Sequence, residues 1–299
     1  MKLARFRIGD GPVRLGRVDL DLAAHDAGDP AVTAGTVVDL GGVPGLGTSL
    51  RALLSEIEQH RPAILAAEGE RYPLSAVTLE APIDEPQKYL AIGMNYREHA
   101  EEARQAGIPI SANQFWFNKQ VSCLNAPFGD IEKPEVSDAL DYEIELGVVI
   151  GRRCRHVAAA DAHSVIAGYL VANDVSVRDW LQQRSPTFTL GKSFDTHGPI
   201  GPWLTTADEI EDPQRLRMVL TVNGEVRQDW RTDDMIHDIA AQIAELSTVM
   251  TLMPGDIIAT GTPSGIGAPQ GRFLRVGDVV RAEIEGLGAI ENRVVGPQA

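Results

Sequence analysis

The chain has 299 residues, of which 43% are hydrophobic and 23% charged, a composition typical of a soluble globular protein with one large domain and an appendage. Its 42 acidic and 27 basic side chains give a net charge of −15, which argues against nucleic-acid binding and against attachment to an anionic membrane surface. The N-terminus lacks an apolar signal region and no apolar run is long enough to span a bilayer, so we expect a cytoplasmic protein.

The first 85 residues are expected to form a small N-terminal domain. Short strand patterns cover 3–8, 13–20, 36–40 and 77–83, and leucine and isoleucine recur at roughly helical spacing in 49–67. Pro62 predicts a break in that helix. The stretch 82–86 begins and ends with proline and is typical of a linker. No pattern in this part indicates chemistry, so we expect the catalytic domain to occupy 86–299.

The first candidate catalytic residues follow the strand pattern 89–93. A helix is predicted from Tyr96, and on it His99 and Glu102 are three residues apart and share a face. A carboxylate beside a histidine orients the imidazole and raises its pKa, which suits a general base. The alternative is a solvated helix with a surface histidine, and this pair alone favours that alternative.

The stretch 141–151 alternates strictly between apolar residues and the polar or small residues that separate them, which predicts a half-buried strand. Glu143 and Glu145 then point to the same face, where like charges repel. A divalent cation such as Mg²⁺, Mn²⁺ or Ca²⁺ would offset this repulsion, because hard cations bind several carboxylate oxygens. Solvent or basic side chains would also offset it, so the alternative is a solvated strand face.

Three further patterns carry polar residues with possible chemistry. Asp174 follows an apolar strand pattern, and a buried strand rarely takes Asp unless it is paired or ligated, so Asp174 is a candidate third ligand. Lys192 lies in the glycine-bounded loop 191–198, which lacks Walker spacing. Thr262 lies in the glycine-rich loop 261–267, which suits a substrate carboxylate. No helix pattern follows that loop, which disfavours a dinucleotide site. The alternatives are a strand-end turn for Asp174 and a surface turn for Lys192.

The C-terminal third is expected to be rich in strands. Asn223-Gly224 between two strand patterns predicts a β-hairpin. An amphipathic helix is predicted over 235–250, and a second hairpin over 276–295.

Taken together, the motifs of 89–295 resemble those of the fumarylacetoacetate hydrolase family, in particular bacterial members that act on acylpyruvates or 2-oxo diacids. Each motif is weak alone, but all five occur in the family's order. They are Asn95-Tyr96-Arg97-Glu98-His99, Asp141-Tyr142-Glu143-Ile144-Glu145-Leu146-Gly147, Asn173-Asp174-Val175-Ser176-Val177-Arg178-Asp179, Gly191-Lys192-Ser193-Phe194-Asp195-Thr196 and Gly261-Thr262-Pro263-Ser264-Gly265. The resemblance implies an α+β fold, predominantly β, with mixed sheets rolled around a metal site.

The resemblance also implies roles for individual residues. One Mg²⁺ or Mn²⁺, with Ca²⁺ as a substitute in crystals, would be bound by three carboxylates. A histidine and a glutamate would form the general base pair on a lid segment, and a lysine would stabilise developing negative charge. The metal ligands would be Glu143, Glu145 and Asp174, the catalytic residues His99, Glu102 and Lys192, and the substrate contacts Arg178, Gln182 and Thr262.

One departure from the family's pattern lies next to a substrate contact. Family members usually carry Gln directly after Arg-Asp-Trp, whereas here Leu181 follows Trp180 and Gln182 and Gln183 come next. Either glutamine would then reach the substrate, and Gln182 is the residue we assign.

The function implied by the resemblance is metal-dependent hydrolysis of the carbon–carbon bond of a 2,4-dioxo acid to pyruvate and a carboxylic acid. Alternatives at the same site are oxaloacetate decarboxylation, isomerisation or hydration of a 2-oxo-enoic diacid, and hydrolysis of a 2,4-dioxo-3-deoxy sugar acid. A non-enzyme alternative is a metal-stabilised ligand-binding scaffold, but a scaffold has no need of the His99–Glu102 pair. The expected partners are a small-molecule 2-oxo acid and a second copy of the chain in a homodimer.

Overall fold

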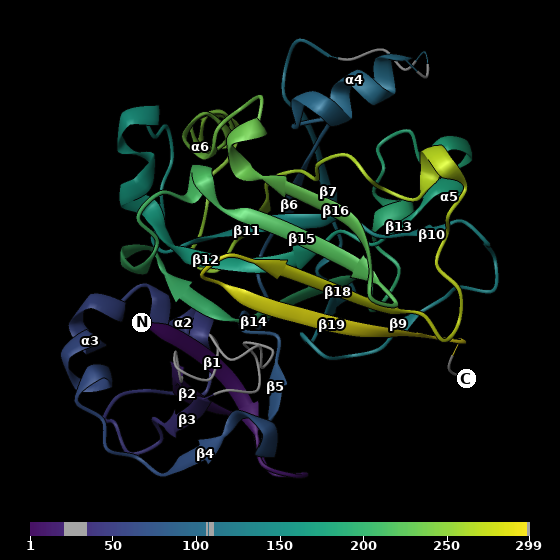
Figure 1. The fold of residues 1–299 in the computed structure, drawn as a ribbon. Helices are drawn as coiled ribbons and strands as arrows, with labels where there is room; N and C mark the ends of the chain where they lie inside the picture. The colour runs from purple at the N-terminus through teal and green to yellow at the C-terminus, as the bar shows by residue number, and fades with distance from the viewer. Residues whose placement is uncertain (21–34, 106, 108–110, 298–299) are drawn as a thin grey trace.

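The computed structural model describes residues 1–20, 35–105, 107 and 111–297, and these residues form mainly β-structure (Figure 1). The strands are β1 (Lys2–Arg7), β2 (Arg14–Leu20), β3 (Gly35–Asp39), β4 (Arg71–Pro73), β5 (Thr78–Glu80), β6 (Tyr89–Gly93), β7 (Phe115–Lys119), β8 (Leu124–Asn125), β9 (Ile131–Glu132), β10 (Leu140–Asp141), β11 (Ile144–Ile150), β12 (Ile166–Asn173), β13 (Ser176–Val177), β14 (Gly198–Thr206), β15 (Arg217–Val222), β16 (Glu225–Arg231), β17 (Ile257–Ala259), β18 (Val279–Ile284) and β19 (Gly288–Val295). The α-helices are α2 (Leu50–Leu54), α3 (Ile57–Leu65), α4 (Arg97–Gln105), α5 (Arg178–Gln183) and α6 (Ile239–Val249).

Two large sheets carry the fold, which confirms the predicted mixed-sheet α+β class. The larger has 12 strands, ordered β4-β3-β2-β1-β14-β12-β11-β17-β6-β7, with β5 on β1 and β8 on β14. Most neighbours are antiparallel, but β17 pairs with β6 in parallel. The second sheet has five strands in the order β16-β15-β18-β19-β9.

The N-terminal strands are joined to the rest of the chain by hydrogen bonds. Strand β1 pairs with β14, with Lys2 opposite Thr205 and Leu3 opposite Leu204. The strands of 1–85 therefore extend the large sheet, at the lower left in Figure 1. The division into domains 1–85 and 86–299 stays a prediction.

Strand β11 is buried on both faces, so the prediction of a half-buried strand over 141–151 was wrong. Ile144, Leu146 and Val148 belong to one core, which also contains residues of the five-stranded sheet and of α6. Val149 belongs to a second core, which contains residues of α2 and α3. The alternation is real, but each face of β11 meets a different apolar layer, and polar residues on it must find partners inside the protein.

The helices lie outside the sheets, and α4 projects at the top of Figure 1. The expected helix over 49–67 is two helices, α2 and α3, which separate around Glu56 rather than at Pro62; that proline lies inside α3. The expected helix over 235–250 begins at Ile239, because Asp238 caps it by accepting from the Ala241 amide.

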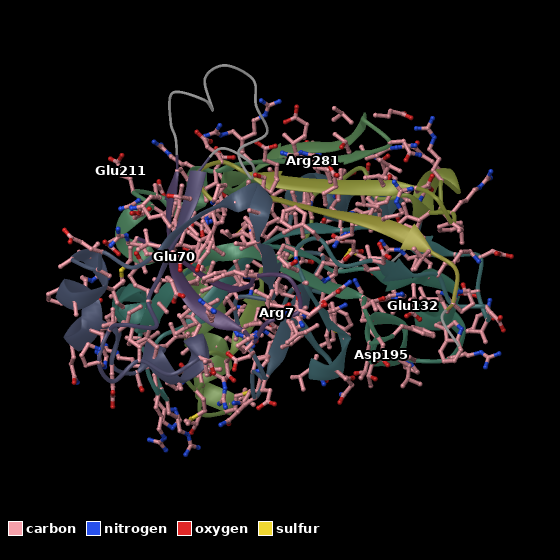
Figure 2. All side chains as sticks on the ribbon, turned by 90° about the horizontal axis from the view of Figure 1, so that it is seen from below. Arg7, Glu70, Glu132, Asp195, Glu211 and Arg281 are labelled. Atoms are coloured by element: carbon pink, nitrogen blue, oxygen red, sulfur yellow. The ribbon has the colours of Figure 1, made fainter. Side chains whose placement is uncertain are left out.

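The hairpin at Asn223-Gly224 is confirmed as β15–β16. Exposed charged side chains such as Glu211 and Asp195 lie at the periphery (Figure 2). Within the described ranges, none of the helices combines the length and apolarity that crossing a membrane requires.

Candidate active site

The three predicted metal ligands lie together at one end of the β11–β12 pair. Glu143 immediately precedes β11, Glu145 lies within it, and Asp174 follows β12. The register places Ile144 opposite Asn173, and the Asp174 amide donates to the Glu143 carbonyl at 2.8 Å. One ligand atom from each carboxylate lies within 4.8 Å of the others, and all three residues are buried. Antiparallel pairing thus unites residues that are 31 positions apart in the chain.

Burial and neighbouring charges shift the pKa values of two of these carboxylates in opposite directions. Burial raises the pKa of Glu145 well above its usual range, and the carboxylates of Asp174 and Glu143 raise it further. Burial acts in the same direction on Glu143, but the Lys192 and Arg178 charges outweigh it and lower the pKa of Glu143. The oxygen-only donor set and the inward-facing carboxylates fit Mg²⁺ or Mn²⁺.

Lys192 lies inside the acidic cluster, as its predicted role requires. It ends a short 3₁₀-helix, Leu190–Lys192, and its Nζ lies 2.6 Å from both Glu143 Oε2 and Asp174 Oδ2. Burial disfavours the ammonium form, but the charges of Asp174 and Glu143 prevail and raise the pKa of Lys192. Lys192 is therefore a buried permanent cation beside the three carboxylates.

A second buried lysine, Lys119, was missed as a site residue. It ends β7 and is 1% exposed. Its Nζ donates to Asp174 Oδ1 at 2.6 Å and to the Lys192 carbonyl at 2.5 Å. Lys119 therefore links the candidate metal ligand Asp174 to the backbone of Lys192. The signal in the sequence was a lysine at the end of an aromatic strand pattern. Lys119 is two residues after Phe117 and four after Phe115, so all three share one face of the strand.

Arg178 contacts carboxylates of the protein. Its Nε donates to Asp141 Oδ2 at 2.8 Å and its Nη2 to Glu143 Oε1 at 2.5 Å. Asp141 in turn accepts from the amides of Gly267 and Ala268. Arg178 thus orients Glu143 and Asp141, and Asp141 holds the loop at Gly267 and Ala268. The assignment of Arg178 as a substrate contact stays a prediction. Asp141 was missed because its partners are distant in sequence.

The His99–Glu102 pair forms on α4, which confirms that the two side chains share a helix face. His99 Nδ1 lies 3.7 Å from Glu102 Oε2, which is too long for a hydrogen bond. The contact with His99 nevertheless lowers the pKa of Glu102. His99 is buried, its Nδ1 has no hydrogen-bond partner among the described residues, and Glu102 is 43% exposed. The two side chains therefore share one face of α4, and the described residues leave the His99 Nδ1 position open.

The glycine-rich loop supports a carboxylate of the site. The Gly261 amide donates to Glu145 Oε2 at 2.8 Å, and Gly261 adopts a φ of 99°, where an L side chain is strained. The Thr262 hydroxyl accepts from Gln228 Nε2 at 2.9 Å, and Gln228 Oε1 accepts from the Ile144 amide. The loop thus fixes Glu145 and aims Thr262 into the site.

The residues that depart from the family's usual Arg-Asp-Trp-Gln pattern lie on α5. Leu181 is buried, and a Cβ on Gly191 would lie only 2.5 Å from Leu181 Cδ2, so the leucine occupies this tight contact. Gln183 is exposed. The side chain of Gln182 lies outside the described part of the structure, so its assignment stays a prediction.

These side chains enclose one small cavity of about 40 Å³. It is lined by His99, Glu143, Glu145, Arg178, Lys192 and Thr262 together with the apolar residues Ile92, Met94, Phe117 and Phe188 and with Gly93. Six of the nine predicted site residues therefore line a single cavity. Asp174 joins them through the carboxylate cluster, and Glu102 through His99.

Comparison with known proteins agrees with this picture. A model of the fumarylacetoacetate (FAA) hydrolase C-terminal domain matches residues 88–295, and the chain belongs to this family. A human mitochondrial oxaloacetate tautomerase is 42% identical over 234 residues, which cover 77% of this chain and 74% of that protein.

Two solved structures match over the whole of both chains. Maleylpyruvate hydrolase from Sphingobium sp. SYK-6, in complex with manganese(II) and pyruvate, has 36% identity and a TM-score of 0.82. A 2-hydroxyhepta-2,4-diene-1,7-dioate isomerase from Mycobacterium marinum has 33% identity and a TM-score of 0.78. The relatives therefore include hydrolases, isomerases and tautomerases.

Proposed function

We propose that this protein is a metal-dependent hydrolase that cleaves a 2,4-dioxo acid of the acylpyruvate type into pyruvate and a carboxylic acid. The observation that carries the proposal is the convergence of three buried carboxylates, a buried lysine and a histidine on one cavity. The hydrolase from Sphingobium, which binds manganese and pyruvate, supports it.

Glu143, Glu145 and Asp174 would hold Mg²⁺ or Mn²⁺. When bound, the cation supplies Lewis-acid polarisation of the carboxylate and 2-oxo oxygens of the substrate. The Lys192 ammonium lies at the same carboxylates and would face the negative charge that develops on the 2-oxo oxygen. Lys119 donates to Asp174 and Arg178 donates to Glu143, so these carboxylates are oriented before the substrate arrives.

The chemical step requires a base at the cavity, and His99 is placed for it. His99 would take a proton from water, and the resulting hydroxide would attack the distal carbonyl of the substrate. The bond between that carbonyl carbon and C3 then breaks. The electron pair passes to the pyruvate fragment as its enolate, and the proton that His99 took from water passes to C3, which yields pyruvate and restores the neutral imidazole. Glu102 would stabilise the imidazolium form of His99.

A second candidate is the interconversion of the keto and enol forms of oxaloacetate, which the 42% identity to the human tautomerase favours. That reaction needs proton transfer at C3 and no attack by water. It uses the same cavity, since both reactions pass through an enolate next to a 2-oxo acid head group. The decarboxylase, isomerase, hydratase and sugar-acid hydrolase alternatives share this requirement.

The test is a substrate panel on protein stripped with EDTA, assayed with and without added Mg²⁺ or Mn²⁺. Acetylpyruvate, fumarylpyruvate and oxaloacetate are supplied, pyruvate is measured, and the enol of oxaloacetate is followed by its ultraviolet absorbance. Metal-dependent pyruvate release from acylpyruvates supports the hydrolase. Enol–keto exchange without pyruvate release would move the assignment to a tautomerase, and pyruvate from oxaloacetate alone to a decarboxylase.

The base assignment is tested by replacing His99 with Ala. We expect turnover to fall by about 10²–10⁴-fold, the usual contribution of a positioned general base, while metal affinity measured by calorimetry is unchanged. The exposed His163→Ala variant is the matched control and should keep full activity. Loss of metal binding in the His99 variant would contradict the role of base. Glu143→Ala should lose both metal and activity.

A further inference from the structure

The cavity at the carboxylates lies next to a much larger one beside α4. The small cavity has a volume of about 40 Å³ and the large one about 600 Å³, and Gly93, Met94 and Phe188 line both. A volume of 40 Å³ is close to that of a single water molecule, whereas about 300–1,000 Å³ is usual for ligand sites. The small cavity is therefore too small for a whole 2-oxo acid, and the tail of such a ligand must extend toward the shared residues.

The shared boundary is aromatic. The ring centroid of Phe188 lies 5.0 Å from that of Phe115 and 5.7 Å from that of Phe117, in edge-to-face arrangements. The Phe117 ring lies directly behind the head-group site, with Lys192 Nζ 5.1 Å from its centroid. A Cβ on Gly93 would lie 2.8 Å from the Phe115 ring, so the chain passes closely over this cluster.

Two of the boundary residues are held in a costly backbone conformation. Phe188 has a φ of 65° and Met94 a φ of 58°. Positive φ is uncommon for residues other than glycine, and such strain persists where surrounding structure enforces it, often at ligand sites. Here it places two large apolar side chains at the passage between the cavities.

The two arginines that line the larger cavity are already paired. Arg97 donates to the Asp233 carbonyl and lies 3.8 Å from Asp234, and it is 60% exposed. Arg104 pairs with Glu101 on the same helix and is 65% exposed. Each arginine that lines this cavity thus has an acidic neighbour, while the passage from the head group is apolar.

We propose that Phe117, Phe188 and Met94 form an acyl-group subsite that selects 2-oxo acids with an uncharged, apolar tail over those with a second carboxylate. An apolar tail gains burial against the rings, whereas a tail carboxylate would lose its hydration against the same rings. The inference rests on the proposed function only in placing the 2-oxo acid head group at the carboxylates.

The experiment compares two ligands that differ only at the tip of the tail, 2-oxohexanoate with a methyl group and 2-oxoadipate with a carboxylate. Their binding to the Mg²⁺-loaded protein is measured by calorimetry, with oxalate as a ligand that has a head group and no tail. We expect 2-oxohexanoate to bind at least about tenfold more tightly than 2-oxoadipate, because the two tails have the same methylene groups and only the terminal carboxylate must lose its hydration.

Variants sharpen the test. Phe188→Ala should weaken 2-oxohexanoate by about tenfold and leave oxalate within about twofold, and Phe188→Arg should shift the preference toward 2-oxoadipate. Phe128→Ala, at an exposed phenylalanine, is the matched control. Equal or tighter binding of 2-oxoadipate to the unmodified protein overturns the proposal, whatever the variants do, and so does failure of all three ligands to bind.

The panel of acylpyruvates tests the hydrolase separately. A preference for the apolar tail without pyruvate release would leave the subsite standing and refute the hydrolase. Pyruvate release with no preference between the two tails would support the hydrolase and refute the subsite.

Discussion

Replacement of Glu145 by Gln tests the contribution of this residue to metal binding with little change in packing. Glu145 is 1% exposed and lies beside Asp174 and Glu143. Gln has nearly the same shape, and its amide oxygen can still accept the hydrogen bond that the Gly261 amide donates at 2.8 Å. The substitution removes a carboxyl group whose ionised form is disfavoured by burial and by its two acidic neighbours, while packing is kept. We therefore expect metal-free Glu145→Gln protein to be at least as stable as the metal-free unmodified protein.

The effect of metal should differ sharply between the two proteins. A ligand present at 100 times its dissociation constant stabilises the folded state by about 2.7 kcal/mol. For a chain of this size that corresponds to a rise in melting temperature of about 5 °C. The Gln variant keeps two carboxylates and loses the third, so the same metal concentration should stabilise it by less than about 1 kcal/mol.

The assay is thermal unfolding of EDTA-stripped protein across a titration of Mn²⁺ and of Mg²⁺. Glu135→Gln is the matched control, because it removes the same charge from an exposed position, and it should respond to metal as the unmodified protein does. An equal metal-induced shift in the Glu145 variant would refute the ligand assignment. A large loss of stability in that variant without metal would refute the argument from repulsion.

Two further predictions concern buried groups outside the proposed chemistry. Lys119→Met removes one of the two buried lysines that pair with Asp174 and leaves Lys192 as the other, so chemical denaturation of the metal-free protein should show about 1.5–3 kcal/mol less stability, the range for a hydrogen bond to a charged group; a loss below about 1 kcal/mol would contradict the pairing seen here. His197 donates from Nε2 to the Glu132 carbonyl at 2.8 Å, its Nδ1 has no partner among the described residues, and burial lowers its pKa to about 4. The unfolded chain then binds a proton that the folded chain refuses, so stability should fall as pH drops from about 6.5 to about 4, by up to about 3 kcal/mol. His197→Gln should flatten that part of the pH profile, and an unchanged profile, relative to the exposed His163→Gln, would contradict it.

Several features of the site were predictable from local patterns. Alternation in 141–151 placed Glu143 and Glu145 on one face, and the polar end of the apolar stretch before Asp174 marked a third carboxylate. The i, i+3 spacing of His99 and Glu102 depends only on helix geometry. The order of five short motifs indicated the family, which the match over 88–295 confirms.

Other features depended on contacts between distant segments and could not be read locally. Lys119 and Asp174 are 55 residues apart, and Asp141 and Arg178 are 37 apart. Their pairing follows from the register of strands and from the position of a loop. Burial of β11 on both faces likewise depends on the layers that cover it.

The sequence by itself determined which residues are candidates for the chemistry and what their local geometry is, because side-chain periodicity along a strand or helix is a property of the backbone. Only the tertiary structure decided how these residues meet. It brought two lysines and an arginine onto the carboxylates and used the glycine loop to support Glu145. It also set the aromatic boundary between the small and large cavities. The reason is that charge pairing and cavity shape depend on distances across the fold, which no short stretch of sequence encodes.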